Sequence, residues 1–466
     1  MTHRWSTLPS WIVMLSALAL LSPGLTNLQA EFPRFPTIEP MFAAPLASRS
    51  DNLPGGTWSR WAEQPTLVDL RDVYLYSQDQ VWAVGGEDRD AADGDIPIIL
   101  HYLDRHWSVE QGLPEETQHD VRFNAVDGAG PDNLWVAGQA HRPTLSPNDV
   151  GILVHYDGAA WQEVPLPESA RIAPLTDIDV VPTEAGFELW AISEANAQCT
   201  SYILHFDGAA WDIETIQNRS LLGIHMLNAE EGQIVTKGAC GAPDGHHYWY
   251  HDGFWQATSV WTPQPLHAVF MVEPTYGWAV GDRGATDEYE GQCHTPGIQC
   301  RWNARQAMRT RLGAAITPNL RDVKMLSREE GWVVGEPWDG LSTVAYLTQE
   351  GNPRWEVVPV ADDPGKALYG LAMLAGPDGH ALEGWAVGVD GTILHYTAPQ
   401  PEPSPTPTTS PTSTETAQPT STATVTPRPS APPSVTVTPT PTSSLPRRQV
   451  FMPMVLHQSR SEGRLD

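Results

Sequence analysis

The sequence predicts an all-β protein, a seven-bladed β-propeller of four-stranded blades with a disordered Pro/Thr-rich tail. Three observations predict this fold. A tryptophan-centred motif repeats along the chain, each copy carries signals for four short strands, and the last copy lacks one strand that the N-terminal part can supply. Periods near 50 residues with four strands per unit are typical of propellers.

The motif is clearest in its last copy. Trp385–Val387 and Thr392–Tyr396 predict two strands, and Asp390 and Gly391 between them supply the positive φ of a tight hairpin turn. The tryptophan recurs at steps of 53, 55, 88, 54 and 53 residues, and the long step contains a degenerate copy at Ile234. The seven predicted second strands are therefore centred on Trp82, Trp135, Trp190, Ile234, Trp278, Trp332 and Trp385.

The other strands follow from the same repeat. An apolar run before each tryptophan predicts the first strand, and a later tryptophan marks the fourth. The first strands begin at Leu70, Phe123, Leu175, Leu221, Leu266, Leu320 and Leu368, and the fourth-strand tryptophans are Trp107, Trp161, Trp211, Trp255, Trp302 and Trp355. A ring must close or leave edges exposed. We therefore predict that Thr57–Glu63 is the outer strand of the blade formed by residues 368–396.

Composition divides the chain into five parts. We expect a signal peptide at 1–30 cleaved near Ala30, a linker at 31–54, the propeller at 55–397, a Pro/Thr-rich stalk at 398–446 and a short apolar segment at 447–466. The apolar core Trp11–Leu21 is too short for a permanent membrane span, so we expect none in the mature chain. An uncleaved anchor is the alternative. The expected location is outside the cell, secreted or associated with the cell surface.

Four cysteines fit an oxidising compartment. Cys199 and Cys240 each follow the second strand of neighbouring blades by a few residues, which puts them on one face. Cys293 and Cys300 lie seven residues apart in one loop. We favour the pairs Cys199–Cys240 and Cys293–Cys300, although four cysteines allow three pairings.

The formal net charge of −29 makes nucleic acid and anionic lipid poor partners. We expect a monomer without cofactor or metal. One acidic stretch is a weak candidate for calcium, but it has no Glu at the twelfth position of a calcium loop, and an acidic surface loop is the alternative. Its carboxylates are Asp88, Asp90, Asp93 and Asp95.

Loop lengths separate the two faces of the predicted ring. The connections between second and third strands are long, and they lie on the same face as the connections between blades, here the long-loop face. The other turns are short and form the short-turn face. Binding residues concentrate on loops held by rigid scaffolds, so we place the site on the long-loop face near the axis. The candidate ligand-binding residues come from the first strands: Arg71, Asp72, Asp177, His267, Arg321 and Asp322.

These side chains suit an anionic or sugar ligand. The alternative is a set of Arg–Asp pairs and trapped waters that satisfies buried polar groups. We assign no catalytic residue, because no nucleophile, zinc or phosphate-loop motif is found. The histidines that repeat in the third strands are interpreted as strand residues, and the tryptophans as packing between blades.

The Trp-Ala-Val-Gly, Ile-Leu-His-Tyr and Asp-Gly-x-x-Trp segments resemble those of exported bacterial propellers of the sialidase-like superfamily, and most of all the photosystem II assembly-factor-like group with BNR-type repeats. The resemblance spans residues 55–397. The first hypothesis is a non-enzymatic propeller that binds a protein or a glycan. A glycan-cleaving hydrolase or lyase and a chaperone-like assembly factor are the alternatives.

Overall fold

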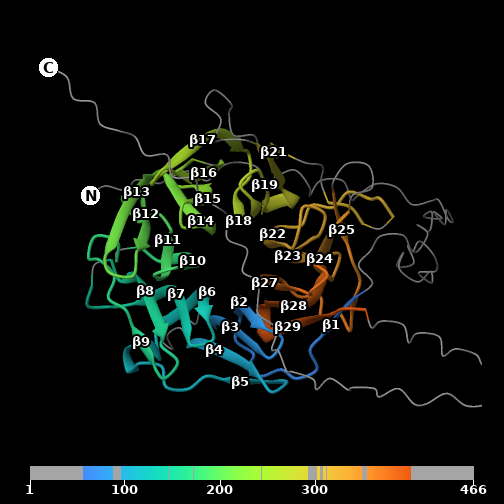
Figure 1. Cartoon of the computed structure of the whole chain (residues 1–466), viewed down its shortest axis with the longest axis horizontal. Helices are drawn as coiled ribbons and strands as arrows, with labels where there is room; N and C mark the ends of the chain where they lie inside the picture. The colour runs from blue at the N-terminus through green and yellow to red at the C-terminus, as the bar shows by residue number, and fades with distance from the viewer. Residues whose placement is uncertain are drawn as a thin grey trace, which may run out of the picture. The chain divides into compact units, whose positions relative to one another are not determined.

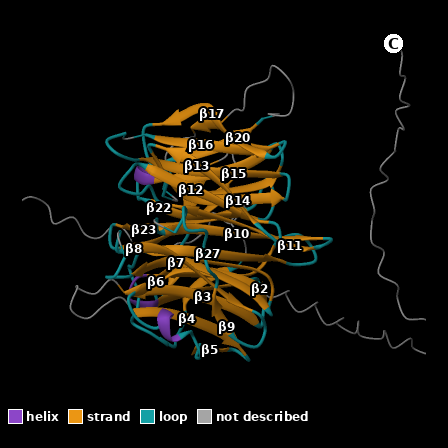
Figure 2. Ribbon diagram, turned by 90° about the vertical axis from the view of Figure 1, so that its left-hand side faces the viewer, coloured by secondary structure: helices purple, strands orange, loops and turns teal. Residues whose placement is uncertain are grey.

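The computed structural model describes residues 56–399 except 88–95, 146, 172, 243, 292–301, 305–307, 311 and 349–353. The described residues form seven sheets arranged around one axis (Figure 1), and Figure 2 shows the same strands from the side. Neighbouring blades share hydrophobic clusters, for example blades 1 and 2 and blades 5 and 6. The predicted seven-bladed β-propeller is therefore confirmed.

Six blades use four consecutive strands each. Blades 1 to 3 are β2 (Leu70–Ser77), β3 (Gln80–Glu87), β4 (Ile96–Leu103) and β5 (His106–Val109); β6 (Val121–Gly130), β7 (Asn133–His141), β8 (Asp149–Tyr156) and β9 (Trp161–Glu163); and β10 (Leu175–Thr183), β11 (Gly186–Ser193), β12 (Thr200–Phe206) and β13 (Trp211–Gln217). Blades 4 to 6 are β14 (Arg219–Asn228), β15 (Glu231–Gly238), β16 (Gly245–His251) and β17 (Phe254–Thr262); β18 (Leu266–Glu273), β19 (Tyr276–Gly281), β20 (Thr286–Glu290) and β21 (Trp302–Ala304); and β22 (Leu320–Met325), β23 (Gly331–Trp338), β24 (Leu341–Thr348) and β25 (Arg354–Val357). Short 3-10 turns lie at η1 (Glu115–Thr117), η2 (Asp282–Gly284) and η3 (Val389–Gly391).

Blade 7 joins the two ends of the propeller. It contains β27 (Leu368–Ala375), β28 (Ala381–Gly388), β29 (Thr392–Thr397) and the N-terminal β1 (Thr57–Arg60), with Trp58 of β1 opposite Tyr396 of β29. The predicted closure is thus confirmed. Two details differ: β1 ends at Arg60, because the chain leaves to start blade 1, and the two-residue β26 (Val360–Ala361) pairs in parallel outside it.

Tryptophans fill the spaces between blades. Trp82 of blade 1 packs with Phe123 and Val136 of blade 2, and Trp278 of blade 5 packs with Trp355 of blade 6. The repeated third-strand histidines stack on the tryptophans of their own blades, with ring centroids 4.1–4.4 Å apart. These pairs are Trp82–His101, Trp135–His155, Trp190–His205 and Trp385–His395. Each histidine therefore serves its own blade.

The glycine of the Trp-Ala-Val-Gly motif has a packing reason. A Cβ on Gly388 would lie 1.9 Å from the carbonyl oxygen of Ala367, and one on Gly85 would lie 1.9 Å from that of Asp69. In blades 1 and 7 the backbone that enters the first strand thus passes directly over this position. Ser193 in blade 3 is the counterpart of these glycines, and its hydroxyl is hydrogen-bonded to Glu194 O and Tyr202 N–H.

The first strands share an irregularity that shapes the axis. In all seven blades the pairing with the second strand shifts by one residue at the second position of the first strand. Such a bulge re-aims side chains. As a result, consecutive residues such as Arg71 and Asp72 both line the axial channel.

The predicted disulfide Cys199–Cys240 is present and links the loops that follow β11 and β15 on the long-loop face. The second predicted pair, Cys293–Cys300, lies outside the described residues. So do the signal peptide, the linker up to residue 54, the stalk from residue 400 on, the apolar C-terminal segment and the acidic stretch Asp88–Asp95. No helix among the described residues is long and apolar enough to cross a membrane.

We expect the double substitution Cys199→Ala/Cys240→Ala to lower the free energy of unfolding by about 2–4 kcal/mol, because the bridge closes a long loop in the unfolded chain. The two cysteines are 41 residues apart. Urea denaturation of the oxidised wild type and the double variant measures this difference. A change below about 0.5 kcal/mol would show that the bridge adds little to the contacts between blades 3 and 4.

Candidate functional site: the axial channel and its long-loop mouth

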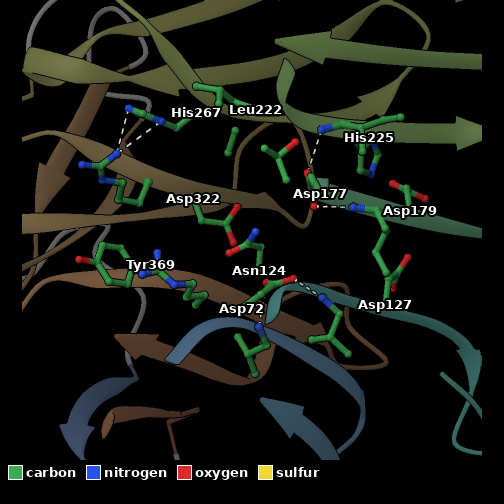
Figure 3. A pocket seen from close by; sticks show the side chains of 18 of the residues that line it. Asp72, Asn124, Asp127, Asp177, Asp179, Leu222, His225, His267, Asp322 and Tyr369 are labelled. Carbon is green, nitrogen blue, oxygen red and sulfur yellow. Dashed lines mark hydrogen bonds between the residues drawn. The ribbon is translucent and has the colours of Figure 1, made fainter. Parts of the chain in front are cut away.

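A cavity of about 660 Å³ lies on the axis and is lined by residues from all seven blades. All six candidate residues line it: Arg71, Asp72, Asp177, His267, Arg321 and Asp322. Glu194, which follows β11, and Lys237, near the end of β15, line it as well. The structure therefore brings the six predicted side chains together around one cavity. Figure 3 shows Asp72, Asp177, His267 and Asp322 among the residues that line it.

The aspartates at the third position of the first strands link neighbouring blades by hydrogen bonds. We call such a bond, from a backbone N–H of one blade to a side chain of the preceding blade, a clasp. Asp72 accepts hydrogen bonds from the backbone N–H of Val73 at 2.8 Å and, across the blade boundary, of Val126 at 2.8 Å. Asp177 and Asp322 repeat this arrangement toward the next blade. Innermost strands have one edge without a partner strand, and buried N–H groups need acceptors. These three carboxylates supply acceptors there.

Both carboxylate oxygens of Asp72, Asp177 and Asp322 accept backbone N–H bonds, an arrangement that the expected alternative of Arg–Asp pairs did not include. The sequence showed that the third position of each first strand holds a small residue or an aspartate. It could not show that the side chain would reach the neighbouring strand.

A second belt of clasps, absent from the predicted site, lies two residues beyond the third position of the first strands, on β6, β10 and β14. The N–H groups of Val180, Met226 and Met271 donate to the preceding blade at 2.7, 3.0 and 3.2 Å. Their acceptors are Asp127, Asp179 and His225. The spacing of two residues between Asp177 and Asp179 on one strand was the available signal, since alternate strand residues share a face.

Lys324 is the cation within this belt. Its Nζ lies 3.8 Å from Asp322 Oδ1 and 5.8 Å from the Phe270 ring centre. Burial alone would lower the pKa of Lys324, but the surrounding carboxylates, Asp322 and Asp72 foremost, raise it above its usual value. Burial also lowers the pKa of His225 to about 3, so His225 is a neutral acceptor.

Burial shifts the acids in the opposite direction. It raises the pKa of Asp72 to about 7 and that of Asp127 to about 6; Lys324 lowers both, whereas Asp322 raises that of Asp72 further. The pKa values of Asp177 and Asp179 are also raised by burial. The deep part of the channel is therefore only partly ionised near neutral pH.

This shift predicts a pH dependence of stability. Folded Asp72 keeps its proton up to about pH 7, whereas the unfolded chain releases it near pH 4, so its contribution is full below pH 4 and is lost as pH rises to 7. One such group steepens the fall of the unfolding free energy by up to about 1.4 kcal/mol per pH unit. We expect Asp72→Asn to remove this part of the slope in urea melts between pH 4 and 7. Asp79→Asn, at an exposed turn, is the control; an equal slope in wild type and Asp72→Asn would contradict the assignment.

The mouth of the channel carries the cations. Arg321 donates to Glu336 and contacts the ring nitrogens of His267, whose Nε2 lies 2.7 Å from Asp282 Oδ1. Lys237 pairs with Glu194 at 3.0 Å. These acids come from second strands and loops, not from the clasping aspartates.

The arginine of blade 1 completes the mouth. Arg71 lies over the ring of Tyr369, 5.6 Å from its centre, and Arg122 of blade 2 lines the same cavity. The mouth is suited to holding an anionic or polar group. Among the described residues, no group of three or more His, Cys, Asp or Glu side chains is placed to bind a metal ion.

No protein-family model matches the sequence, and no curated protein matches it. Solved structures do. YCF48 bound to a D1 peptide is 14% identical over 76% of this chain and all of that chain, with a TM-score of 0.50. YCF48 from Cyanidioschyzon merolae (14% identity, 73% of this chain, 98% of that chain, TM-score 0.49) and the WD40 propeller domain of Doa1 (12%, 74%, 97%, 0.49) are also similar. At this level of identity the similarity to the first structure shows the fold alone: the chain is a seven-bladed β-propeller.

Proposed function

We propose that the protein is a non-enzymatic binding module that holds a segment of a partner protein at the long-loop mouth of its axial channel. The observation that carries this proposal is the concentration of cations at the channel. The chain has 56 acidic residues against 27 Lys and Arg, yet five of those cations line one cavity. They are Arg71, Arg122, Lys237, Arg321 and Lys324, and the chain has one other lysine, Lys366.

The deep part of the channel and its mouth have different roles. The deep aspartates are committed to backbone N–H groups of adjacent blades, so a ligand that used them would open those clasps. Arg321 and Lys237 are instead paired with the side chains of Glu336 and Glu194, and such pairs at a partly exposed site are worth little, about 1 kcal/mol or less. An incoming carboxylate can therefore compete for Arg321 at low cost, which favours binding at the mouth.

Two observations favour a protein partner over a glycan. One is a similar solved structure, and the other is the set of side chains that line the channel mouth. A propeller of the same fold, YCF48, has been solved with a D1 peptide bound. The resemblance of the repeats to assembly-factor-like propellers agrees with a peptide ligand. Among the first-strand residues at the mouth, Tyr369 is the aromatic side chain, and it is engaged by Arg71.

A combined peptide and glycan array tests the proposal. We expect the full chain to bind a subset of acidic peptides, and Arg71→Ala and Arg321→Ala each to weaken that binding about tenfold, as for a charged contact in a partly dry site. Arg105→Ala, at an exposed turn on the short-turn face, is the matched control. Equal binding by wild type and both mouth variants would move the site elsewhere, and binding to glycans alone would exclude a protein partner.

A glycan-cleaving enzyme is the second candidate, favoured by one observation: the channel contains carboxyl groups with raised pKa values, Asp72 at about 7. Glycosidases use one protonated and one ionised carboxyl group. Chromogenic glycosides assayed with wild type and Asp72→Asn decide between the two. Turnover by wild type that disappears in a folded Asp72→Asn variant would support the enzyme; no turnover by wild type would remove it.

We also propose that the protein acts outside the cell, secreted or at the cell surface. The disulfide between blades 3 and 4 supports an oxidising compartment. Fractionation of expressing cells, with the N-terminal sequence of the product, tests export, and cleavage near Ala30 is expected. Removal of residues 447–466 tests retention at the surface.

A further inference from the structure

Blade 6 carries a hairpin that projects on the long-loop face. β23 and β24 continue to a two-residue turn at Asp339 and Gly340, both with positive φ, whereas the turn of blade 7 follows directly after Gly388. Trp338 and Leu341, opposite each other beside the turn, are 40% and 41% exposed. We refer to residues 336–342 as the blade 6 finger.

The connection to blade 7 braces the finger. The N–H of Ser342 donates to the Asp363 carboxylate at 3.1 Å, and the Ser342 hydroxyl accepts from the N–H of Lys366 at 3.0 Å. Gly365 packs so closely that a Cβ there would lie 2.5 Å from the carbonyl oxygen of Gly340. The exposed aromatic side chain thus stands on a fixed support, and a preorganised surface loses less entropy on binding than a mobile loop.

The base of the finger is part of the mouth. Glu336 accepts from Arg321 and, at 2.9 Å, from Asn319 Nδ2. Trp338 follows two residues later, about 7 Å further along an extended strand. A polar contact at Arg321 and an apolar contact at Trp338 are therefore within reach of one short extended peptide.

We propose that the blade 6 finger is the apolar anchor for the partner segment: an extended peptide that places an acidic group at Arg321 and an apolar side chain against Trp338 and Leu341. This inference rests on the proposed function. Tryptophan dominates binding energies when an aromatic side chain is covered by a partner, and the polar mouth supplies the rim. A second copy of this chain fits the surface less well, because each copy carries a net charge of −29.

The test uses a display library of random 15-residue peptides selected on the full wild-type chain, with the most enriched peptide then synthesised and labelled. We expect that peptide to contain an acidic and an apolar residue. Trp338→Ala weakens its binding about tenfold or more and Leu341→Ala about threefold. Leu103→Ala leaves it unchanged; Leu103 is 42% exposed beside a similar two-residue turn on the short-turn face. Both finger variants should unfold at the wild-type denaturant midpoint.

Arg321→Gln separates the two claims. If it weakens binding while Trp338→Ala and Leu341→Ala do not, the finger is no anchor and the proposed function stands. If none of the three variants changes binding, or the library gives no binder, both proposals are overturned. Sedimentation velocity tests whether the blade 6 finger instead mediates self-association. If the wild type is a dimer and Trp338→Ala is a monomer that still binds the peptide, the finger is a dimer contact and the proposal of an apolar anchor is overturned.

Discussion

Replacing Trp58 with alanine is expected to lower the free energy of unfolding by about 3–5 kcal/mol, the usual range for a buried tryptophan. Trp58 is 2% exposed, and its ring lies 5.7 Å from that of Trp332 and 5.5 Å from that of Tyr396. It thus connects the N-terminal strand to both blades 6 and 7. Its loss leaves a cavity at the one place where the ring is closed by pairing rather than by chain connectivity. Urea denaturation followed by tryptophan fluorescence measures the change.

Two matched variants control this experiment. Trp338→Ala removes an exposed tryptophan and is expected to change the unfolding free energy by less than about 0.5 kcal/mol. Trp58→Phe keeps an aromatic ring, and the indole N–H that it removes has no hydrogen-bond partner among the residues that the structure describes. Trp58→Phe should therefore cost clearly less than Trp58→Ala. If Trp58→Ala were as stable as Trp338→Ala, the closure by β1 would not hold the ring together.

A single methyl group at Gly388 is expected to destabilise the protein by about 3 kcal/mol, at the upper end of the range for overpacking. The added Cβ would lie 1.9 Å from the carbonyl oxygen of Ala367 and 2.8 Å from the Leu368 Cα. Both are backbone atoms, so the strand that enters blade 7 must move. Thermal and urea unfolding of Gly388→Ala measure the loss.

Gly130→Ala is the control for backbone entropy. A Cβ on Gly130 would meet no atom within 4 Å, and the backbone of Gly130 does not have a positive φ. Alanine should be neutral there or stabilise slightly, by reducing the freedom of the unfolded chain. Equal effects of the two substitutions would mean that the motif glycine is not required by packing.

The repeats of this sequence predicted its fold well, because each of the seven blades requires similar residues at equivalent positions. The tryptophan, the preceding apolar run and the Asp390–Gly391 turn each serve the local structure of one blade, so they are visible locally. Even the missing last strand was informative, because a ring cannot leave an edge unpaired. The extra strand β26 escaped prediction, since a two-residue parallel pairing has no periodicity.

The sequence indicated that the candidate residues lie near the axis of the ring. It did not indicate which groups they contact. First-strand periodicity brought Arg71, Asp72 and Arg321 to the axis. Whether an axial aspartate meets an arginine or a backbone N–H depends on how adjacent blades are rotated, which no single repeat encodes. Lys324 was missed for the same reason: its role as counter-ion to carboxylates of other blades exists only in the assembled ring.

The crystal structure of the full chain with the selected peptide tests the central claim most directly. We predict that the peptide lies on the long-loop face, with a carboxylate hydrogen-bonded to Arg321 or Arg71 and the bond from Val126 N–H to Asp72 intact. A peptide on the short-turn face or on an outer strand, or one that enters the channel by displacing Asp72 from Val126, would contradict it.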